Sequence, residues 1–211
     1  AASESILKRF KAEHSRLNIS LLNNDKDNGS PKKKAIKKGI AMASFDWIIT
    51  TDADCVVPES WLRILDKKIR EQSPKMIVAP VAYLPKNGFL HHFQGLDFLS
   101  LQGITMGGFG MKDKKFGHPF LCNGANLCYS KESFREVNGF EGNDHIASGD
   151  DIFLLEKMFQ KYPEKVQFIK SKEAIVLTSS KDSLKELIQQ RVRWAAKTTA
   201  YDSMYTKLVG L

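Results

Sequence analysis

Two short acidic motifs and one helical motif carry the residue types best suited to chemistry. The first is Asp52-Ala53-Asp54, which follows the apolar run 47–51. If that run is a strand, two carboxylates lie at its carboxyl end, where open α/β sheets bind ligands. Carboxylate oxygens there can hold Mg²⁺ or Mn²⁺ together with substrate phosphates. The motif therefore predicts a metal and phosphate site. The alternative is a solvated strand end whose aspartates cap the next helix.

The second acidic motif is the pair Asp150-Asp151, preceded by Ser148-Gly149. Adjacent carboxylates repel each other, which favours a proton-accepting role for one of them. The alternative is structural: Ser148 can cap a helix, and carboxylates in a first helical turn interact favourably with the helix dipole.

The third motif consists of Gln190, Arg193 and Trp194. At positions i, i+3 and i+4 of a predicted helix, they share one face. An amide, a guanidinium and an indole on one face can grip a diphosphate and stack against a ring. An amphipathic helix with Trp194 packed into the core explains the same spacing.

Two further segments are candidates for substrate binding. Asn123 and Gly124 lie in a segment that can line a pocket, although a plain turn explains it almost as well. Lys32 belongs to a lysine-rich predicted helix whose basic face is expected to be mostly solvated. One or two of its lysines, placed near a phosphate site, would attract an anionic donor.

The elements that must position these motifs alternate along the chain. They predict an α/β layered domain with a largely parallel sheet. Strands are expected at 19–22, 47–51, 76–82, 121–129, 166–169 and 174–177. Helices are expected at 3–17, 32–43 and 89–104, after Pro58, from Ser148, and from a Ser183–Glu186 capping box to about residue 200, with a loop at 107–110.

Composition limits the class of protein. A length of 211 residues with 42% hydrophobic residues fits one folded domain without disulfides. The three cysteines form no CxxC pair, which favours a reducing compartment. A net charge of +8 indicates an anionic partner: phosphate groups, nucleic acid or an anionic membrane surface. No apolar stretch is long enough to span a membrane.

In order and spacing, these motifs resemble the family 2 inverting glycosyltransferases, which have the GT-A fold. Residues 29–39 are similar to the family's Gly-Lys-Ala-Asn-Gly-like helix, Asp52-Ala53-Asp54 to its DxD, and Gly149-Asp150-Asp151 to its acidic pair. Gln190 with Arg193-Trp194 resembles QxxRW, found in the subgroup with cellulose, chitin and hyaluronan synthases. The resemblance covers about residues 18–195.

The resemblance implies sugar transfer from a nucleotide sugar to an acceptor hydroxyl, in polysaccharide or glycan synthesis. Asp52 and Asp54 would hold Mg²⁺ or Mn²⁺ on the diphosphate, with Asp54 the more direct ligand. Asp151, beside Asp150, would deprotonate the acceptor in one inverting displacement. The acceptor would be a glycan or a lipid-linked molecule. Gln190, Arg193 and Trp194 would close over the diphosphate and the acceptor end. Lys32, Asn123 and Gly124 remain the further candidates for substrate binding.

The same resemblance carries expectations about the whole protein. The run 19–22 looks like the family's third strand, so we expect a single catalytic domain, 1–211, that lacks the N-terminal strands and stops before C-terminal membrane segments. The fragment would be soluble, and the full-length protein would lie on the cytoplasmic side of the cell membrane. A basic surface would fit an anionic inner leaflet.

Two other functions compete with this interpretation. Residues 48–56 resemble the first motif of haloacid-dehalogenase-type phosphatases, in which Asp52 would be a nucleophile and the later Gly-Asp-Asp would bind Mg²⁺. The expected strand and basic helix ahead of Asp52 argue against a phosphatase. A pI of about 9.3 would suit a nucleic-acid-binding module, but such a module leaves the acidic motifs unexplained.

Overall fold

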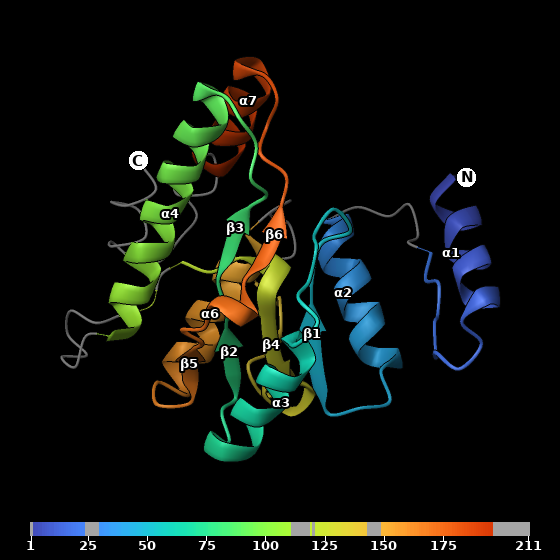
Figure 1. The fold of residues 1–211 in the computed structure, drawn as a ribbon. Coiled ribbons are helices and arrows are strands. Elements are labelled where there is room, and N and C mark those ends of the chain that lie inside the picture. Colours follow the sequence, from blue (N-terminus) through green and yellow to red (C-terminus); the bar gives the residue numbers. More distant parts are fainter. Residues whose placement is uncertain (1, 24–29, 111–118, 120, 143–148, 196–211) are drawn as a thin grey trace.

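The structure is a computed structural model that describes residues 2–23, 30–110, 119, 121–142 and 149–195. It has the α/β architecture expected from the sequence (Figure 1). The helices are α1 (Ala2–Glu13), α2 (Pro31–Met42), α3 (Trp61–Gln72), α4 (Phe89–Gly110), α5 (Lys131–Glu136), α6 (Asp150–Lys161) and α7 (Leu184–Ala195), with 3₁₀ turns η1 (Gly124–Asn126) and η2 (Lys172–Ala174). The strands are β1 (Trp47–Thr50), β2 (Met76–Val78), β3 (Val81–Tyr83), β4 (Leu127–Ser130), β5 (Val166–Phe168) and β6 (Val176–Thr178).

The main sheet has four strands in the order β1-β4-β2-β5. β4 runs antiparallel to both β1 and β2, whereas β5 runs parallel to β2. Three of the four strands therefore share one direction, and β4 is inserted between them in reverse. Thr50, the last residue of β1, pairs with Leu127, the first residue of β4. The end of β1 and the segment before β4 consequently meet at one edge of the sheet.

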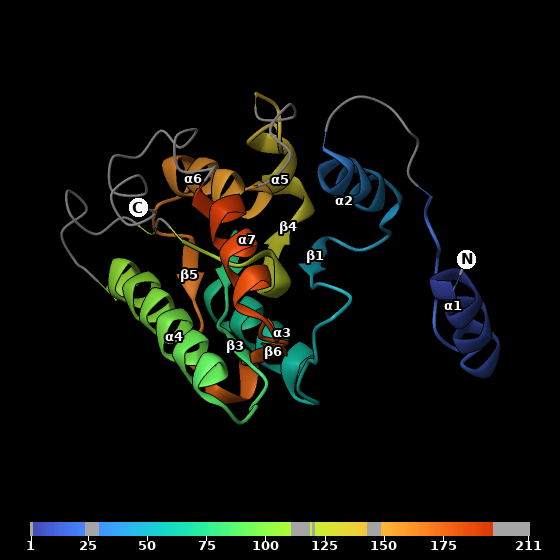
Figure 2. The same ribbon diagram turned by 90° about the horizontal axis from the view of Figure 1, so that it is seen from above.

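Helices cover both faces of this sheet (Figure 2). Along β2 the side chains alternate: Met76 and Val78 pack with residues of α2, α5 and α6, whereas Ile77 packs with residues of α3 and α4. These three side chains are at most 1% exposed. A strand buried on both faces needs a continuous apolar run rather than an alternating one, as the sequence shows here.

The expected strand 76–82 is in fact two strands in two sheets. β2 ends at Val78, and β3 begins at Val81 and pairs in parallel with β6. Pro80 lies between them, and a proline cannot donate the backbone hydrogen bond that a central strand requires. The chain therefore leaves the main sheet at this point and adds to a second, smaller one.

Two other expectations are wrong. Residues 19–22 are not a strand, because no described strand pairs with them and Leu21 is exposed. The glycine-rich segment 107–110 continues α4 as helix. α6 begins at Asp150, after Gly149, whose φ is 79°. The expected cap at Ser148 lies outside the described residues, as does Gly29.

α2 begins at Pro31, one residue before the expected helix 32–43. Ser30 caps it by accepting a hydrogen bond from the backbone N–H of Lys33, and Pro31 occupies the first turn. The predicted start of α7 is confirmed, because Ser183 accepts a hydrogen bond of 3.3 Å from the N–H of Glu186. The expected extension of this helix beyond Ala195 falls on residues that the structure does not describe.

α1 lies at the periphery of the molecule, beyond α2 (Figure 1). Its side chains from Glu4 to Glu13 are exposed, so it contributes nothing to the core. Among the described helices, none combines the length and the apolar character needed to cross a bilayer.

Candidate active site

The end of β1, the turn before β4 and the start of α6 are joined by one glycine. The Thr50 hydroxyl donates a hydrogen bond of 2.7 Å to the carbonyl of Gly124. The N–H of Gly124 in turn donates to Oδ2 of Asp151 at 3.0 Å. Both acidic motifs are therefore brought to one edge of the sheet, although about 100 residues separate them in the chain.

Lys32 joins the two acidic motifs directly. Its Nζ lies 3.3 Å from Oδ1 of Asp52 and 3.5 Å from Oδ2 of Asp150. Burial lowers the pKa of Lys32, but the carboxylates of Asp150, Asp52 and Asp151 outweigh that effect and leave the pKa above its usual value. The ammonium is consequently charged throughout the physiological range and belongs to the acidic cluster.

The negative field of this cluster reaches the neighbouring thiol of Cys122. Burial raises the pKa of Cys122 well above its usual value, and the carboxylates of Asp151, Asp150 and Glu156 raise it further. A thiol in such surroundings stays protonated and is a poor nucleophile or metal ligand. Cys122 is therefore a packed side chain rather than a reactive one.

The two aspartates of α6 have different surroundings. Asp150 is buried, with 7% of its surface exposed, and its carboxylate faces Lys32. Asp151 is partly exposed, and its second oxygen, Oδ1, accepts a hydrogen bond of 2.9 Å from the N–H of Ile152. Backbone groups thus orient the carboxylate of Asp151, and solvent can still reach it.

Asp54 lies on the exposed turn that follows β1. The N–H of Cys55 donates to the carbonyl of Asp52 at 3.1 Å and closes that turn. The Asp54 carboxylate is exposed, and within the described residues its one side-chain hydrogen bond comes from the Cys55 thiol, at 3.9 Å. Within the described part of the chain, no three His, Cys, Asp or Glu side chains are grouped closely enough to hold a metal ion by themselves. A divalent cation held by Asp52 and Asp54 would therefore have to complete its shell with phosphates or water, as Mg²⁺ commonly does.

Asn123 has a structural role that differs from the expected one. Its Oδ1 accepts a hydrogen bond of 3.0 Å from the N–H of Ala125 and so caps η1. The turn that the sequence offered as an alternative for Asn123 and Gly124 is therefore present. Gly124 lies closer to the acidic cluster: a Cβ at this position would lie 3.3 Å from Nζ of Lys32 and 3.7 Å from Oδ2 of Asp150.

The residues of the third motif do not share one environment. Trp194 is partly buried, and its ring lies 6.4 Å from that of Phe98 on α4. Arg193 is exposed, and Oε1 of Gln190 is buried without a hydrogen-bond partner in the described structure. Arg191 makes a second contact with α4, because it forms an ion pair with Asp97, and it lies over the Trp194 ring at 4.4 Å from its centroid. The core-packing alternative thus holds for Trp194.

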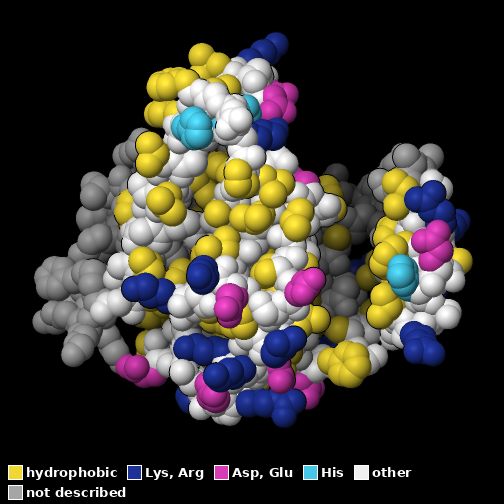
Figure 3. Space-filling model, viewed as in Figure 1, with side chains coloured by type: hydrophobic (Ala, Val, Ile, Leu, Met, Phe, Trp, Pro, Cys, Tyr) yellow, Lys and Arg dark blue, Asp and Glu magenta, His cyan; other side chains and the backbone are white. Residues whose placement is uncertain are grey.

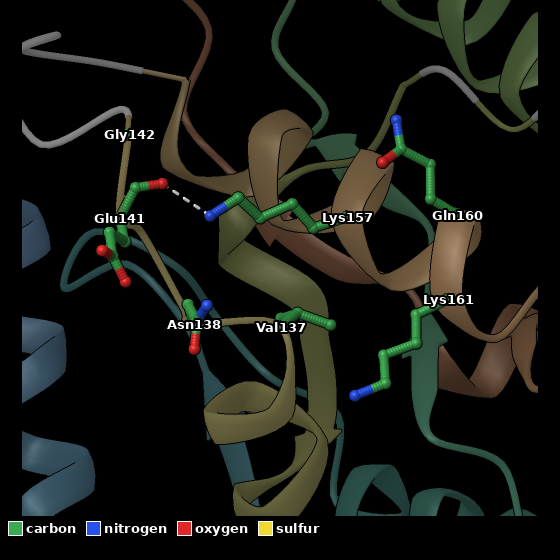
Figure 4. Close-up of a pocket in the computed structure, with 7 residues that line it drawn as sticks. All are labelled: Val137, Asn138, Glu141, Gly142, Lys157, Gln160 and Lys161. Carbon is green, nitrogen blue, oxygen red and sulfur yellow. Dashed lines mark hydrogen bonds between the residues drawn. The ribbon is translucent and has the colours of Figure 1, made fainter.

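A separate hollow of about 500 Å³ lies between α6 and the turn after α5 (Figure 4). None of the predicted site residues line it. Lys157 reaches across it and donates to the carbonyls of Gly139 at 3.0 Å and Glu141 at 2.6 Å. These hydrogen bonds hold the turn against α6, so Lys157, which lines the hollow, has a structural role.

Sequence reasoning missed two residues that shape the site. Thr50 positions Gly124, and its signal was a polar residue at the end of an apolar strand. Lys33 is only 1% exposed, with its Nζ 5.1 Å from the centroid of the Phe153 ring. Lys33 shares a helical face with Ile36 and Ile40, and this spacing could have predicted a buried lysine.

Comparisons with known proteins agree with this architecture. The model of a family described as Glycosyl transferase family 21 matches residues 2–206. The match confirms the expectation of a glycosyltransferase at the level of the enzyme class. A comparison with curated proteins found no match.

Solved structures of S. aureus TarS have a similar fold. TarS 1-349 superposes with a TM-score of 0.58 at 13% identity, over 93% of this chain and 53% of TarS 1-349. Its complex with UDP-GlcNAc gives a TM-score of 0.56 at 12% identity, over 94% and 55% of the two chains. The complex with UDP gives 0.54 at 12% identity, over 93% and 53%. The chain thus spans about half the length of TarS 1-349, and the likeness confirms the expected fold class.

Proposed function

Because the chain belongs to glycosyl transferase family 21, we propose that it carries the catalytic centre of an enzyme that moves a sugar from a nucleotide sugar to an acceptor hydroxyl. The observation that carries this proposal is the meeting of Asp52, Asp150 and Asp151 around Lys32 and Gly124. A fold neighbour, TarS 1-349, has been crystallised with UDP-GlcNAc, which makes UDP-sugars the first donors to test.

The donor diphosphate is expected to bind at the end of β1. Asp52 and Asp54 would hold a divalent cation there. Mg²⁺ or Mn²⁺ would suit this position, because such an ion is commonly shared between one or two carboxylates and the phosphates of the substrate. When bound, this cation would neutralise the charge that builds on the departing nucleoside diphosphate. Lys32, at the same edge, supplies a further positive charge toward the phosphates.

Asp151 is the proposed general base. Its carboxylate is partly exposed, whereas that of Asp150 is buried and paired with Lys32. A proton from the acceptor hydroxyl would pass to Asp151 as the oxygen attacks the anomeric carbon and the bond to the diphosphate breaks. One such displacement inverts the configuration of that carbon. A positioned base of this kind contributes about 10²–10⁴ in rate.

The finer assignments extend this proposal. Likeness to family 2 and its QxxRW subgroup would place Gln190 and Arg193 over the diphosphate and the acceptor end, whereas Trp194 packs against Phe98. Gln190 Oε1 supports such a role, because a buried oxygen without a partner is normally satisfied by a ligand or water. The proposed acceptor is a glycan or a lipid-linked molecule.

Attachment of the full-length protein to a membrane is a further part of the proposal. α4 exposes several large apolar side chains, of which Phe89 and Leu96 are 87% and 71% exposed. Hydrophobic side chains are visible over much of the face that the space-filling view shows (Figure 3). Exposed apolar side chains gathered on one helix indicate a surface that another molecule or a membrane covers, and a net charge of +8 complements an anionic leaflet.

A donor screen tests the proposed reaction. Full-length protein is incubated with UDP-sugars and other nucleotide sugars in Mn²⁺ or Mg²⁺, and release of nucleoside diphosphate is measured. We expect release with at least one donor and an inverted anomeric configuration in the product by NMR. Hydrolysis of p-nitrophenyl phosphate with no release from any nucleotide sugar would instead favour the phosphatase. Of the two elements expected ahead of Asp52, the strand 19–22 is not formed and only the basic helix α2 argues against a phosphatase.

A further inference from the structure

Lys32 occupies the point at which the two acidic motifs come closest. Its Nζ is 3.3 Å from a carboxylate oxygen of Asp52 and 3.5 Å from one of Asp150. The side chain starts from the first turn of α2, which Ser30 and Pro31 fix in place. Gly124 leaves room for the ammonium, because a Cβ there would stand 3.3 Å from it. The position is therefore defined by three separate elements of the fold.

This arrangement bears on any divalent cation at the end of β1. Asp52 is one of the two carboxylates proposed to hold that cation, and its Oδ1 already faces a positive charge. A metal ion that approached Asp52 would meet the ammonium at close range, and like charges repel strongly in a partly buried site. Asp54, exposed on the following turn, has no lysine or arginine against it in the described structure.

We infer that Lys32 is the internal cation of the donor-free site and competes with a divalent metal ion for Asp52. The inference rests on the proposed function and adds an order of events to it. Without donor, the ammonium neutralises Asp52 and Asp150 and keeps metal affinity low. The phosphates of an arriving nucleotide offer Lys32 another anionic partner, so that metal and diphosphate enter the site together.

Binding of Mn²⁺ alone tests this inference without any nucleotide or catalysis. Free Mn²⁺ is measured by electron paramagnetic resonance during titration of the full chain and its variants. Lys32→Gln removes the charge but keeps a group that can hydrogen-bond the carboxylates. We expect it to bind Mn²⁺ about tenfold more tightly than the native protein, because one adjacent like charge is gone. Lys32→Arg, which keeps the charge, should stay within about twofold of the native affinity.

Two controls locate the effect. Lys34→Gln removes a charge from the same helix on its opposite side, about 200° around the axis from Lys32, and should leave Mn²⁺ affinity nearly unchanged. Asp52→Asn added to Lys32→Gln should abolish the gain. If Lys32→Gln fails to melt cooperatively, Lys32→Met provides the second neutral variant.

An unchanged or weaker Mn²⁺ affinity in the neutral variant would overturn the inference, as would absence of binding in both proteins. Failure of the proposed function has a different signature: no nucleotide sugar would be turned over, whatever the Mn²⁺ affinities are. The two outcomes are therefore distinguishable.

Discussion

The N–H of Gly124 donates a hydrogen bond of 3.0 Å to Oδ2 of Asp151 and so fixes the first turn of α6 against the segment that precedes β4. The carbonyl of the same glycine accepts a hydrogen bond from Thr50 at the end of β1. The carboxylate is held by the backbone rather than by another mobile side chain. Such fixed placement is a condition for efficient proton transfer in a bound complex.

Replacement of Asp151 by Asn is expected to abolish most turnover. Asn retains an oxygen that can accept the N–H of Gly124, but it cannot take up a proton. We predict that kcat of the full-length enzyme falls about 10²-fold or more while donor affinity is preserved. Steady-state kinetics and donor titration measure the two effects separately. Near-normal turnover, or a larger loss in Asp150→Asn than in Asp151→Asn, would exclude Asp151 as the base.

Asp54→Ala is expected to weaken the metal-dependent binding of a nucleoside diphosphate. Its carboxylate is exposed at the edge where the diphosphate is proposed to lie. We predict an affinity loss of about tenfold or more in Mn²⁺ and little change in EDTA, measured by titration calorimetry with UDP. Asp46→Ala, just before β1 and also exposed, is the matched control. Equal affinities in Asp54→Ala and the native protein would remove Asp54 from the metal site.

Gly139→Ala is expected to destabilise the fold because the turn after α5 has no room for a side chain. Gly139 has a φ of 47°, and a Cβ there would lie 2.5 Å from the ring of Phe134. We predict a loss of about 2 kcal/mol or more in the free energy of unfolding, from overpacking and backbone strain together. Gly142 has a φ of 84°, but a Cβ there would have no atom within 4 Å. Gly142→Ala therefore measures the backbone strain without the overpacking. Urea unfolding of both variants should show the larger loss for Gly139→Ala.

Stability is expected to decline in alkali. Burial raises the pKa of Cys128 to about 12, whereas the thiol of the unfolded chain ionises near pH 8.5. Above that lower value the unfolded state has fewer bound protons than the folded state, so the free energy of unfolding falls as pH rises toward about 12. We predict a loss of about 1 kcal/mol or more between about pH 8.5 and pH 10 in urea titrations. Cys128→Ala should reduce this slope but not abolish it, because the pKa of the Cys122 thiol is also raised by burial. An equally steep slope in Cys128→Ala would contradict the assignment.

The exposed side of α4 is expected to bind anionic membranes. Phe93 and Leu96 are 51% and 71% exposed, so their replacement by Ser should leave the core intact. We predict that the double variant loses most of its co-sedimentation with vesicles of phosphatidylserine and phosphatidylcholine. Leu62→Ser on α3, where the side chain is 59% exposed, serves as the control. Equal losses in both variants, or no binding by the native protein, would rule out α4 as the membrane contact.

Local patterns in the sequence were sufficient for most of the elements and for the edge of the sheet that carries the site. The apolar run before Asp52 and the Ser183 cap act within a few residues, so both can be recognised in the sequence. The first acidic motif, Asp52-Ala53-Asp54, could be assigned to an edge of the sheet because a strand delivers its following residues there.

Long-range packing decided the rest. Lys32 and Lys33 are neighbours in one basic run, yet one pairs with two carboxylates and the other is buried against Phe153. The pattern of residues 19–22 is typical of a strand, but none of the described strands pairs with them. Trp194 packs with Phe98 instead of joining Arg193 on a shared exposed face. Which neighbours a side chain meets depends on segments far away in the chain. Periodicity and spacing report only local preference, so these contacts became known from the tertiary structure alone.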